Sequence, residues 1–249
     1  MGIFDRFFKK KEVLPPFDLS NFKVDMHSHL IPGIDDGATS LENSIELIKG
    51  LKDLGYSKLI TTPHIMSDFY KNTPEIILGG LELVRAELKK QQIDIRIEAA
   101  AEYYCDKAFE VLIEQKKLLT FGNNHVLFEL SYLNPPEIFE TITFKLQMEG
   151  YKPVLAHPER YSYWFQSFEK FREIRDKGVL FQVNLASLTG YYGAGSKRTA
   201  ERLVEEGLID IIGTDTHKIS HIELFKNKAI KEIYLKKLVD SGRLLNESL

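Results

Sequence analysis

Seven short apolar runs alternate along the chain with longer segments in which apolar residues recur at helical spacing. The runs are rich in Val, Ile, Leu and Phe, as β-strands are. They lie in the segments KVDMH (23–27), KLITTPH (58–64), DIRIEAAAEYY (94–104), HVLFELS (125–131), KPVLAHPE (152–159), LFQVNLAS (180–187) and IDIIGTDTH (209–217). The helical patterns fall near residues 41–54, 75–91, 106–116, 136–149, 167–177 and 196–206, with another after residue 221.

This alternation predicts a parallel sheet covered by helices. Thr39 and Glu42 have capping-box spacing before the first helical pattern. Glycines stand where several helices should end, at Gly55, Gly150, Gly178 and Gly207. Seven such units in a chain of this length favour a distorted (β/α)7 barrel, with an open doubly wound sheet as the alternative. We expect residues 1–22 to be a tail and linker, and residues 23–249 to be a single domain.

Side chains that bind metals stand where these predicted strands end. His27 and His29 are two residues apart and therefore share one face of a strand. Converging neutral imidazoles suit a metal ion, and the carboxyl ends of barrel strands meet on one face. The candidates are His27, His29, His64, Glu102, Glu129, His157, Asp215 and His217. Helix caps or loop histidines would explain them one by one, but a shared cation explains them together, including the carboxylates that are costly to bury unpaired.

Composition narrows the classes of function. The 249 residues are 43% hydrophobic and 28% charged, which is enough for a substantial core. The formal net charge of -3 gives no reason to expect a nucleic-acid partner. The single cysteine, Cys105, lacks an arginine six positions on, where Val111 stands, so a cysteine-dependent tyrosine phosphatase is excluded. No secretory or membrane-spanning segment is evident, and we expect a cytoplasmic protein.

The N-terminal segment MGIFDRFFKKK is unlike the rest of the chain. In a helix, Phe4, Phe7 and Phe8 would share one face next to three lysines. This arrangement suggests weak contact of residues 1–11 with an anionic membrane, which would place the protein peripherally at the inner face. A loose or packed tail is the plainer interpretation.

The ordered series DMHSH, TTPH, AAEYY, LFELS, AHPERY and GTDTH resembles the polymerase and histidinol phosphatase (PHP) superfamily. Within it, the chain is most similar to the bacterial tyrosine phosphatases encoded with capsule and exopolysaccharide genes. The resemblance covers residues 23–221 and implies a distorted seven-unit barrel with three divalent metals, manganese being favoured over iron or zinc. It also implies phosphotyrosine hydrolysis on a membrane-associated bacterial tyrosine kinase. A histidinol-phosphatase-type enzyme and a noncatalytic metal-binding protein are the alternatives.

The resemblance also implies which residues hold each metal. The first metal would bind His27, His29, Glu102 and Asp215; the second would share Glu102 and bind Glu129 and His157; the third would bind Asp36, His64 and His217. Asp35 offers the same chemistry as Asp36 and is the alternative there. Four ligand carboxylates against three divalent ions leave a charge of about +2, which attracts a phosphate dianion.

Arg160, in HPERY, matches the phosphate-binding arginine of the family, and a planar guanidinium suits bidentate phosphate contact. A surface salt bridge with Glu159 or Glu169 is the alternative. Some relatives carry another arginine after the final DxH, where this chain has Lys218 and His221.

That departure leaves the proton donor to the leaving group open. We take His64 and His221 as candidate catalytic residues beside Arg160. Tyr103 and Tyr161 are candidate contacts for the aromatic ring of the substrate, although tyrosines at these positions serve equally well to pack loops over the barrel.

Overall fold

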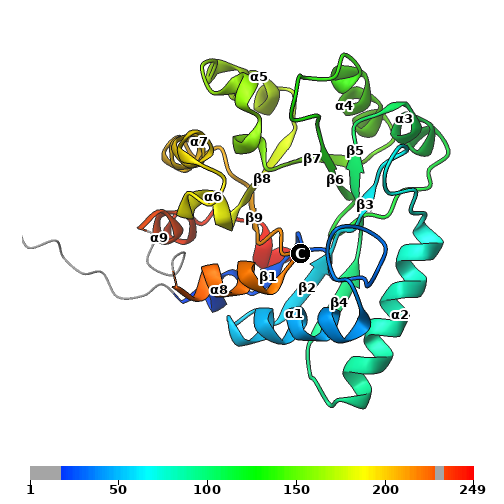
Figure 1. The fold of residues 1–249 in the computed structure, drawn as a ribbon. Coiled ribbons are helices and arrows are strands. Elements are labelled where there is room, and N and C mark those ends of the chain that lie inside the picture. Colours follow the sequence, from blue (N-terminus) through cyan, green and yellow to red (C-terminus); the bar gives the residue numbers. More distant parts are fainter. Residues whose placement is uncertain (1–17, 228–232) are drawn as a thin grey trace, which may run out of the picture.

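The computed structural model describes residues 18–227 and 233–249. In these ranges the strands are β1 (Val24–Asp25), β2 (Lys58–Thr61), β3 (His64–Ile65), β4 (Arg96–Ala99), β5 (Glu102–Tyr104), β6 (His125–Glu129), β7 (Lys152–Ala156), β8 (Leu180–Asn184) and β9 (Ile211–Gly213). The helices are α1 (Leu41–Asp53), α2 (Pro74–Lys90), α3 (Lys107–Glu114), α4 (Phe139–Met148), α5 (Glu169–Asp176), α6 (Leu185–Thr189), α7 (Ala194–Glu205), α8 (Ile219–Asn227) and α9 (Ile233–Asp240). The helices surround the strands (Figure 1).

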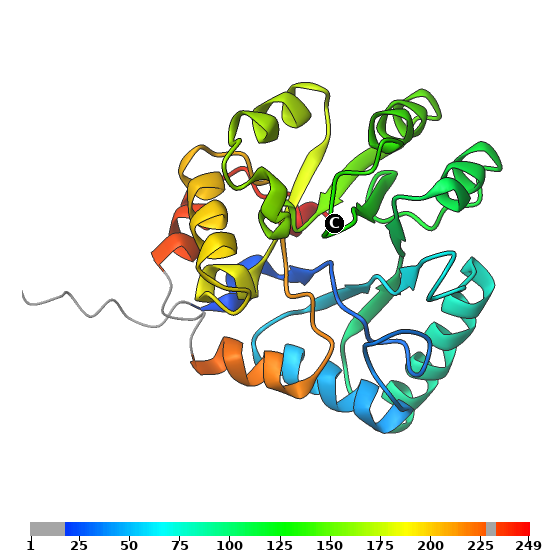
Figure 2. The same ribbon diagram turned by 45° about the horizontal axis from the view of Figure 1, so that its top comes forward.

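The strands form a ring that is interrupted between the last strand, β9, and the first strand, β1. One sheet has the order β1-β2-β4 and the other the order β3-β5-β6-β7-β8-β9, and every pair is parallel. The predicted strands over 58–64 and 94–104 are each split in two, because β2 and β4 leave one sheet and continue in the other as β3 and β5. A parallel bridge between Ser28 and Thr216 brings the last strand back to the first. The fold is thus the predicted distorted (β/α)7 barrel, which Figure 2 shows tilted.

Several local predictions need correction. The N-cap of α1 is Ser40, whose side chain accepts a hydrogen bond from the Asn43 amide, and not Thr39. The glycines expected to end helices do follow α1, α4, α5 and α7, with positive φ. The predicted linker ends before residue 22, because Leu19 and Phe22, in the short 3-10 turn η2 (Leu19–Phe22), are buried in the main core.

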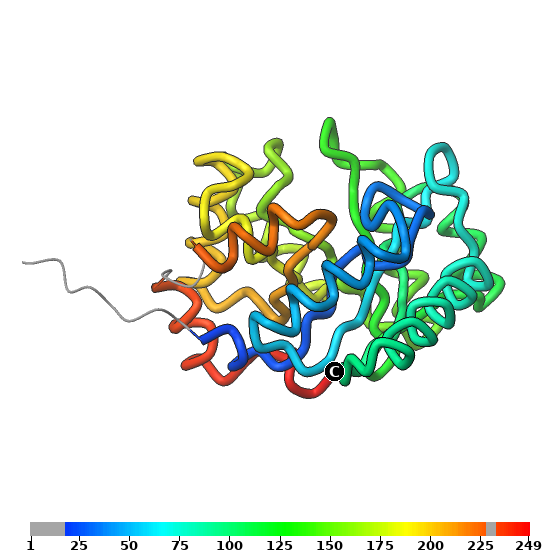
Figure 3. The backbone as a smooth tube through the Cα atoms, turned by 60° about the horizontal axis from the view of Figure 1, so that its bottom comes forward, coloured from blue at the N-terminus to red at the C-terminus, as the bar shows by residue number. Residues whose placement is uncertain are grey.

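The interior of the barrel holds its own apolar cluster, separate from the main core that includes the helices. We call it the barrel plug; it consists of Val24, Met26, Ile60, Ala100, Phe121, Leu127, Val154, Ala156 and Ile211. Leu245 and Leu249 pack against it. The C-terminal end therefore lies at the centre of the ring in Figure 1 and at the lower side of the molecule in Figure 3.

The predicted membrane-contacting segment, residues 1–11, lies outside the described residues. Within the described ranges, no helix has both the length and the apolar character needed to cross a bilayer.

Candidate metal centre

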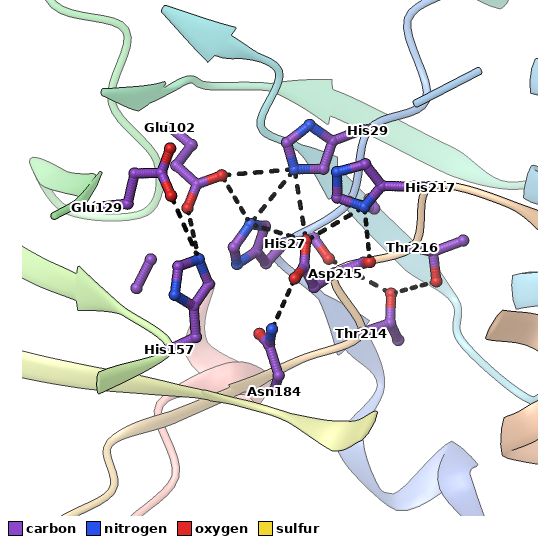
Figure 4. Close-up of polar contacts among 12 residues, drawn as sticks. His27, His29, Glu102, Glu129, His157, Asn184, Thr214, Asp215, Thr216 and His217 are labelled. Carbon is purple, nitrogen blue, oxygen red and sulfur yellow. Dashed lines mark hydrogen bonds and ion pairs between the residues drawn. The ribbon is translucent and has the colours of Figure 1, made fainter. Parts of the chain in front are cut away.

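The predicted ligands gather beyond the carboxyl ends of the strands, at the mouth of the barrel. A pocket of about 430 Å³ opens there. Its lining includes Asp36, His64, Glu102, Glu129, His157, Arg160, Asp215, His217 and His221. His27 and His29 are fully buried and point into the same cluster from the segment after β1 (Figure 4). All nine predicted metal ligands thus surround one site, and we refer to these nine as the ligand layer.

Their ligand atoms fall into overlapping groups, each with its atoms within 4.8 Å of one another. The groups are His29, Asp36, His64 and His217; His27, His29 and Asp215; His27, Glu102 and His157; and His64, Glu102 and Glu129. These four groups match the three predicted sets only in part. The first contains the whole predicted third set, the second lacks Glu102 of the predicted first set, and the predicted second set is divided between the last two groups. His29 also approaches the set around Asp36, and His64 also approaches Glu102 and Glu129.

Glu102 lies at the centre of the ligand layer. Its Oε2 is 3.2 Å from His27 Nε2, 3.5 Å from His29 Nε2 and 3.3 Å from His64 Nδ1. Its Oε1 is 3.0 Å from His157 Nε2. A carboxylate whose two oxygens face different imidazoles has the placement of a bridging ligand.

Hydrogen bonds orient the histidines for coordination. His27 Nδ1 is 2.8 Å from Gln182 Oε1, His29 Nδ1 is 2.8 Å from a carboxylate oxygen of Asp35, and His217 Nδ1 is 2.9 Å from the backbone oxygen of Asp215. Because these oxygens only accept, each Nδ1 donates, and each Nε2 presents its lone pair to the cluster. Histidines that ligate metals show this arrangement.

A buried ring nitrogen of His64 also indicates that this cluster binds a metal. Among the described residues, His64 Nδ1 finds no hydrogen-bond partner, yet it is buried and faces Glu102 and Glu129. An unsatisfied buried polar atom is unfavourable unless something binds it. The donor set of imidazole nitrogens and carboxylate oxygens, with no thiolate, fits divalent manganese, iron or zinc.

The two adjacent aspartates have different roles. The side chain of Asp35 is buried, and its oxygens accept from the amides of Gly37 and His64 as well as from His29. Asp36 is half exposed, and its Oδ1 lies 3.5 Å from His64 Nε2 and 3.4 Å from His217 Nε2. Asp35 therefore orients a histidine, whereas Asp36 faces two imidazole nitrogens.

The buried carboxylates Glu102 and Glu129 differ in how easily they ionise. Burial opposes ionisation of Glu102, but the histidines around it hold its pKa well below the usual range. Burial, reinforced by the neighbouring Glu102 charge, raises the pKa of Glu129 well above its usual value. Side chains alone therefore do not compensate the negative charge at Glu129, and a bound cation would.

Arg160 lies on the wall of the pocket, in the turn η3 (Pro158–Arg160) that follows β7. Its Nη1 donates to Asp215 Oδ2 at 3.2 Å. The alternative salt bridges are wrong, because Glu159 is buried and accepts from the amide of Asn184 and the hydroxyl of Ser187, while Glu169 pairs with Arg172.

Two supporting residues, Gln182 and Asn184, were missed in the sequence. They lie on one face of β8, where Gln182 holds His27 and Asn184 Nδ2 donates to Asp215 Oδ2 at 2.6 Å. The sixth predicted strand was the only one without a candidate at its end, and its polar residues at a spacing of two were the available signal.

The prediction that Tyr103 and Tyr161 contact the substrate is wrong. Both are fully buried. The Tyr103 hydroxyl accepts from the Leu119 amide, and the Tyr161 hydroxyl accepts from the Leu130 amide and donates to the backbone oxygen of Ala156. Four other tyrosines line the pocket: Tyr70, Tyr132, Tyr191 and Tyr192.

His221 also lines the pocket, as its predicted role requires. Its Nε2 lies 3.3 Å from the Tyr191 hydroxyl, and burial lowers its pKa to about 4. Lys218 lines the same pocket.

Two ligand-layer residues, His157 with φ 34° and Asp215 with φ 52°, adopt the left-handed conformation that non-glycine residues rarely take. Such backbone strain is common at functional sites.

Cys105 is buried, and burial raises the pKa of its thiol to about 12. A thiol in this state is a poor nucleophile.

A parallel seven-unit barrel with histidines and carboxylates at its strand ends is a PHP-type barrel. A family model for capsular polysaccharide synthesis proteins, CpsB/CapC, matches residues 23–241. The chain therefore belongs to the CpsB/CapC family, which confirms the resemblance found in the sequence.

Among its relatives, tyrosine-protein phosphatase YwqE of Bacillus subtilis is 29% identical over 197 residues, covering 79% of this chain and 78% of YwqE. Tyrosine-protein phosphatase CpsB of Streptococcus pneumoniae is 29% identical over 203 residues, covering 79% of this chain and 83% of CpsB.

Solved structures agree on the fold. One from a study of YwqE and CpsB, described as unique metal-dependent tyrosine phosphatases, has a TM-score of 0.75 at 26% identity, covering 88% of this chain and 86% of that one. A histidinol phosphate phosphatase from Lactococcus lactis has a TM-score of 0.55 at 14% identity, covering 89% and 94%, and shares the fold alone.

Proposed function

We propose that this protein is a metal-dependent protein-tyrosine phosphatase that acts in capsular or exopolysaccharide production. The observation that carries the proposal is Glu102, buried among four imidazole rings, with Arg160 in the same pocket. Its relatives YwqE and CpsB are tyrosine-protein phosphatases, which supports phosphotyrosine as the substrate.

We assign the nine residues of the ligand layer to three divalent ions, with Glu102 shared between two of them and Asp36 rather than Asp35 as a ligand. Bound divalent ions supply Lewis acidity, which activates water as a nucleophile and offsets charge on the phosphoryl oxygens. Manganese is our first choice, and iron and zinc suit the same donors.

The side chains of the chain itself bind and orient the phosphoryl group. Arg160 offers several N–H donors in one plane, which suits two oxygens of a phosphate. Tyr70 and Tyr191, in the pocket lining, offer apolar ring faces for the phenyl group of the substrate. His64 and His221 stay candidates for proton transfer, because both line the pocket.

We propose a flexible tail of a membrane-associated bacterial tyrosine kinase as the protein substrate, because an extended segment can enter an open pocket. Residues 1–11 would hold the enzyme near that membrane from the cytoplasmic side by weak contact.

The test combines metal analysis with turnover. The purified protein should contain close to three divalent ions per chain, and it should hydrolyse a phosphotyrosine peptide much faster than a phosphoserine peptide or histidinol phosphate. Chelation should abolish the activity, and manganese should restore it. Preference for histidinol phosphate would make the protein a small-molecule phosphatase, and a metal-loaded protein inert toward every phosphomonoester would contradict catalysis altogether.

A further inference from the structure

The guanidinium of Arg160 lies over two tyrosine rings. Its Cζ is 4.7 Å from the centroid of the Tyr132 ring and 4.1 Å from that of Tyr192. Tyr132 belongs to the segment after β6, Arg160 to the turn after β7 and Tyr192 to the segment after β8. Since β6, β7 and β8 are neighbours in the sheet, the connections that follow three successive strands build this stack, with Tyr192 in the segment between α6 and α7.

The stack is connected to the ligand layer through Asp215, whose two oxygens face different groups. Oδ1 lies 3.5 Å from His27 Nε2, 3.6 Å from His29 Nε2 and 3.4 Å from His217 Nδ1. Oδ2 accepts from Asn184, from Arg160 and, at 3.3 Å, from the Tyr192 hydroxyl. Tyr192 thus touches both the arginine, with its ring, and the carboxylate, with its hydroxyl.

An arginine at this position needs such support. Its side chain is long and flexible, and the same pocket contains other carboxylates, notably Glu129, toward which a free guanidinium would turn. Ring faces attract the cation without using any of its five N–H donors. Contact with two rings restricts the guanidinium and keeps N–H donors at its edge available, and this edge is the part that binds two phosphate oxygens side by side.

The geometry points to Tyr132 and Tyr192 as positioning residues that hold Arg160 edge-on to the substrate phosphate, with Tyr192 also fixing the Asp215 oxygen that faces away from the histidines. This inference rests on the proposed phosphatase function, but the pocket needs only to bind a phosphate for it to be tested. It assigns the tyrosines to the arginine rather than to the phenyl ring of the substrate.

The experiment measures binding of inorganic phosphate to the metal-loaded protein by calorimetry, together with metal content and turnover of a phosphotyrosine peptide. Tyr192→Leu and Tyr132→Leu should each keep the metals and weaken phosphate binding about tenfold, while Tyr192→Phe, which keeps the ring, should lose about twofold to threefold. Combined with Arg160→Ala, either leucine variant should cause a much smaller loss than it does alone, because both tyrosines act mainly through the arginine. A small remaining loss would come from the contacts of Tyr192 with Asp215 and of Tyr132 with His157. Phe69→Leu, at a residue that is 77% exposed and is not part of the pocket lining, is the matched control.

Three results would overturn the inference: unchanged phosphate affinity in both leucine variants, a leucine effect that persists fully in the Arg160→Ala background, or metal loss in both leucine variants. The second would show direct contact with the ligand, and the third a purely structural role. If the wild type binds phosphate through Arg160 but does not hydrolyse phosphotyrosine, the proposed function fails and the positioning role stands. If the wild type hydrolyses phosphotyrosine while both leucine variants bind phosphate normally, the proposed function stands and the positioning role fails.

Discussion

The barrel plug and the ligand layer share the same strands but have opposite chemistry. Leu127 belongs to the plug, and Glu129, two residues further along β6, belongs to the ligand layer. Ala100 and Glu102 repeat the relation on the neighbouring segment. A step of two residues keeps a side chain on the inner face and moves it about 7 Å toward the mouth. One end of the interior is thereby dry and apolar, and the other gathers charge.

The difference separates stability from function. Burial of plug side chains is favourable without any ligand, whereas burial of the carboxylates is unfavourable until a cation compensates them. The plug should therefore determine whether the barrel folds, and the ligand layer whether it works. Substitutions in the two regions should have different signatures.

The largest effect is expected from Glu102→Gln. Removing the charge at the centre of the ligand layer should reduce metal content and lower turnover by a factor on the order of 10³ or more. Metal analysis and phosphotyrosine hydrolysis measure the two consequences. Glu98→Gln is the matched control, since Glu98 pairs with Lys58 and Arg96 at the surface. Normal metal content and rate in Glu102→Gln would contradict the bridging role.

The second-largest effect is expected from Leu127→Ala in the barrel plug. The lost contacts and the cavity should lower the free energy of unfolding by about 3 kcal/mol. Turnover per folded molecule should stay close to wild type, because Leu127 lies in the apolar barrel plug and not in the ligand layer. Denaturant unfolding measures the change, and Leu133→Ala, at a residue that is 89% exposed, should change it little. A selective loss of turnover with normal stability would show that the two regions are not separable.

Asp35→Asn should have a smaller effect. It weakens the acceptor for His29 Nδ1 and should lower metal affinity roughly 10-fold to 100-fold, as substitutions of residues behind a ligand do. Turnover at saturating metal should recover most of the wild-type rate. Activity titrated against added manganese distinguishes this from Asp36→Asn, for which excess metal should restore less. Equal behaviour of the two variants would remove the distinction between orienting residue and ligand.

The smallest effect is expected from Cys105→Ala. The thiol is buried and protonated, and it takes no part in the proposed chemistry. Turnover should stay within about twofold of wild type, and alkylating reagents should not inactivate the native enzyme. A folded variant without activity would point to a thiol mechanism.

Much of this architecture could be predicted from the sequence, because strand alternation and residue chemistry are local. The histidines and carboxylates at the strand ends were identified in that way, and they do converge. The same alternation would have excluded Tyr103, since a residue next to an inward-facing Glu102 must face outward.

What could not be predicted depends on loops. Tyr161 lies four residues after His157, which is in the left-handed conformation, and its ring is buried in the main core. Tyr192 reaches the pocket from the segment between α6 and α7, well beyond the end of β8. Such placement depends on tertiary structure and leaves no periodic signal in the sequence. The correction of Thr39 to Ser40 as N-cap is a one-residue shift of a helix boundary, which local signals define poorly.

The bridge between Ser28 and Thr216 has a kinetic consequence. Across this seam, the amide and hydroxyl of Thr214 donate to Asp25, 189 residues away in sequence, and His27 and Asp215 meet there. Closing so long a loop is slow, and we expect it to come late in folding. We therefore expect the ligand layer to assemble only after the ring has closed, so that a bound ion would stabilise the completed barrel and not the folding transition state. Added metal should slow unfolding while leaving the rate of folding nearly unchanged.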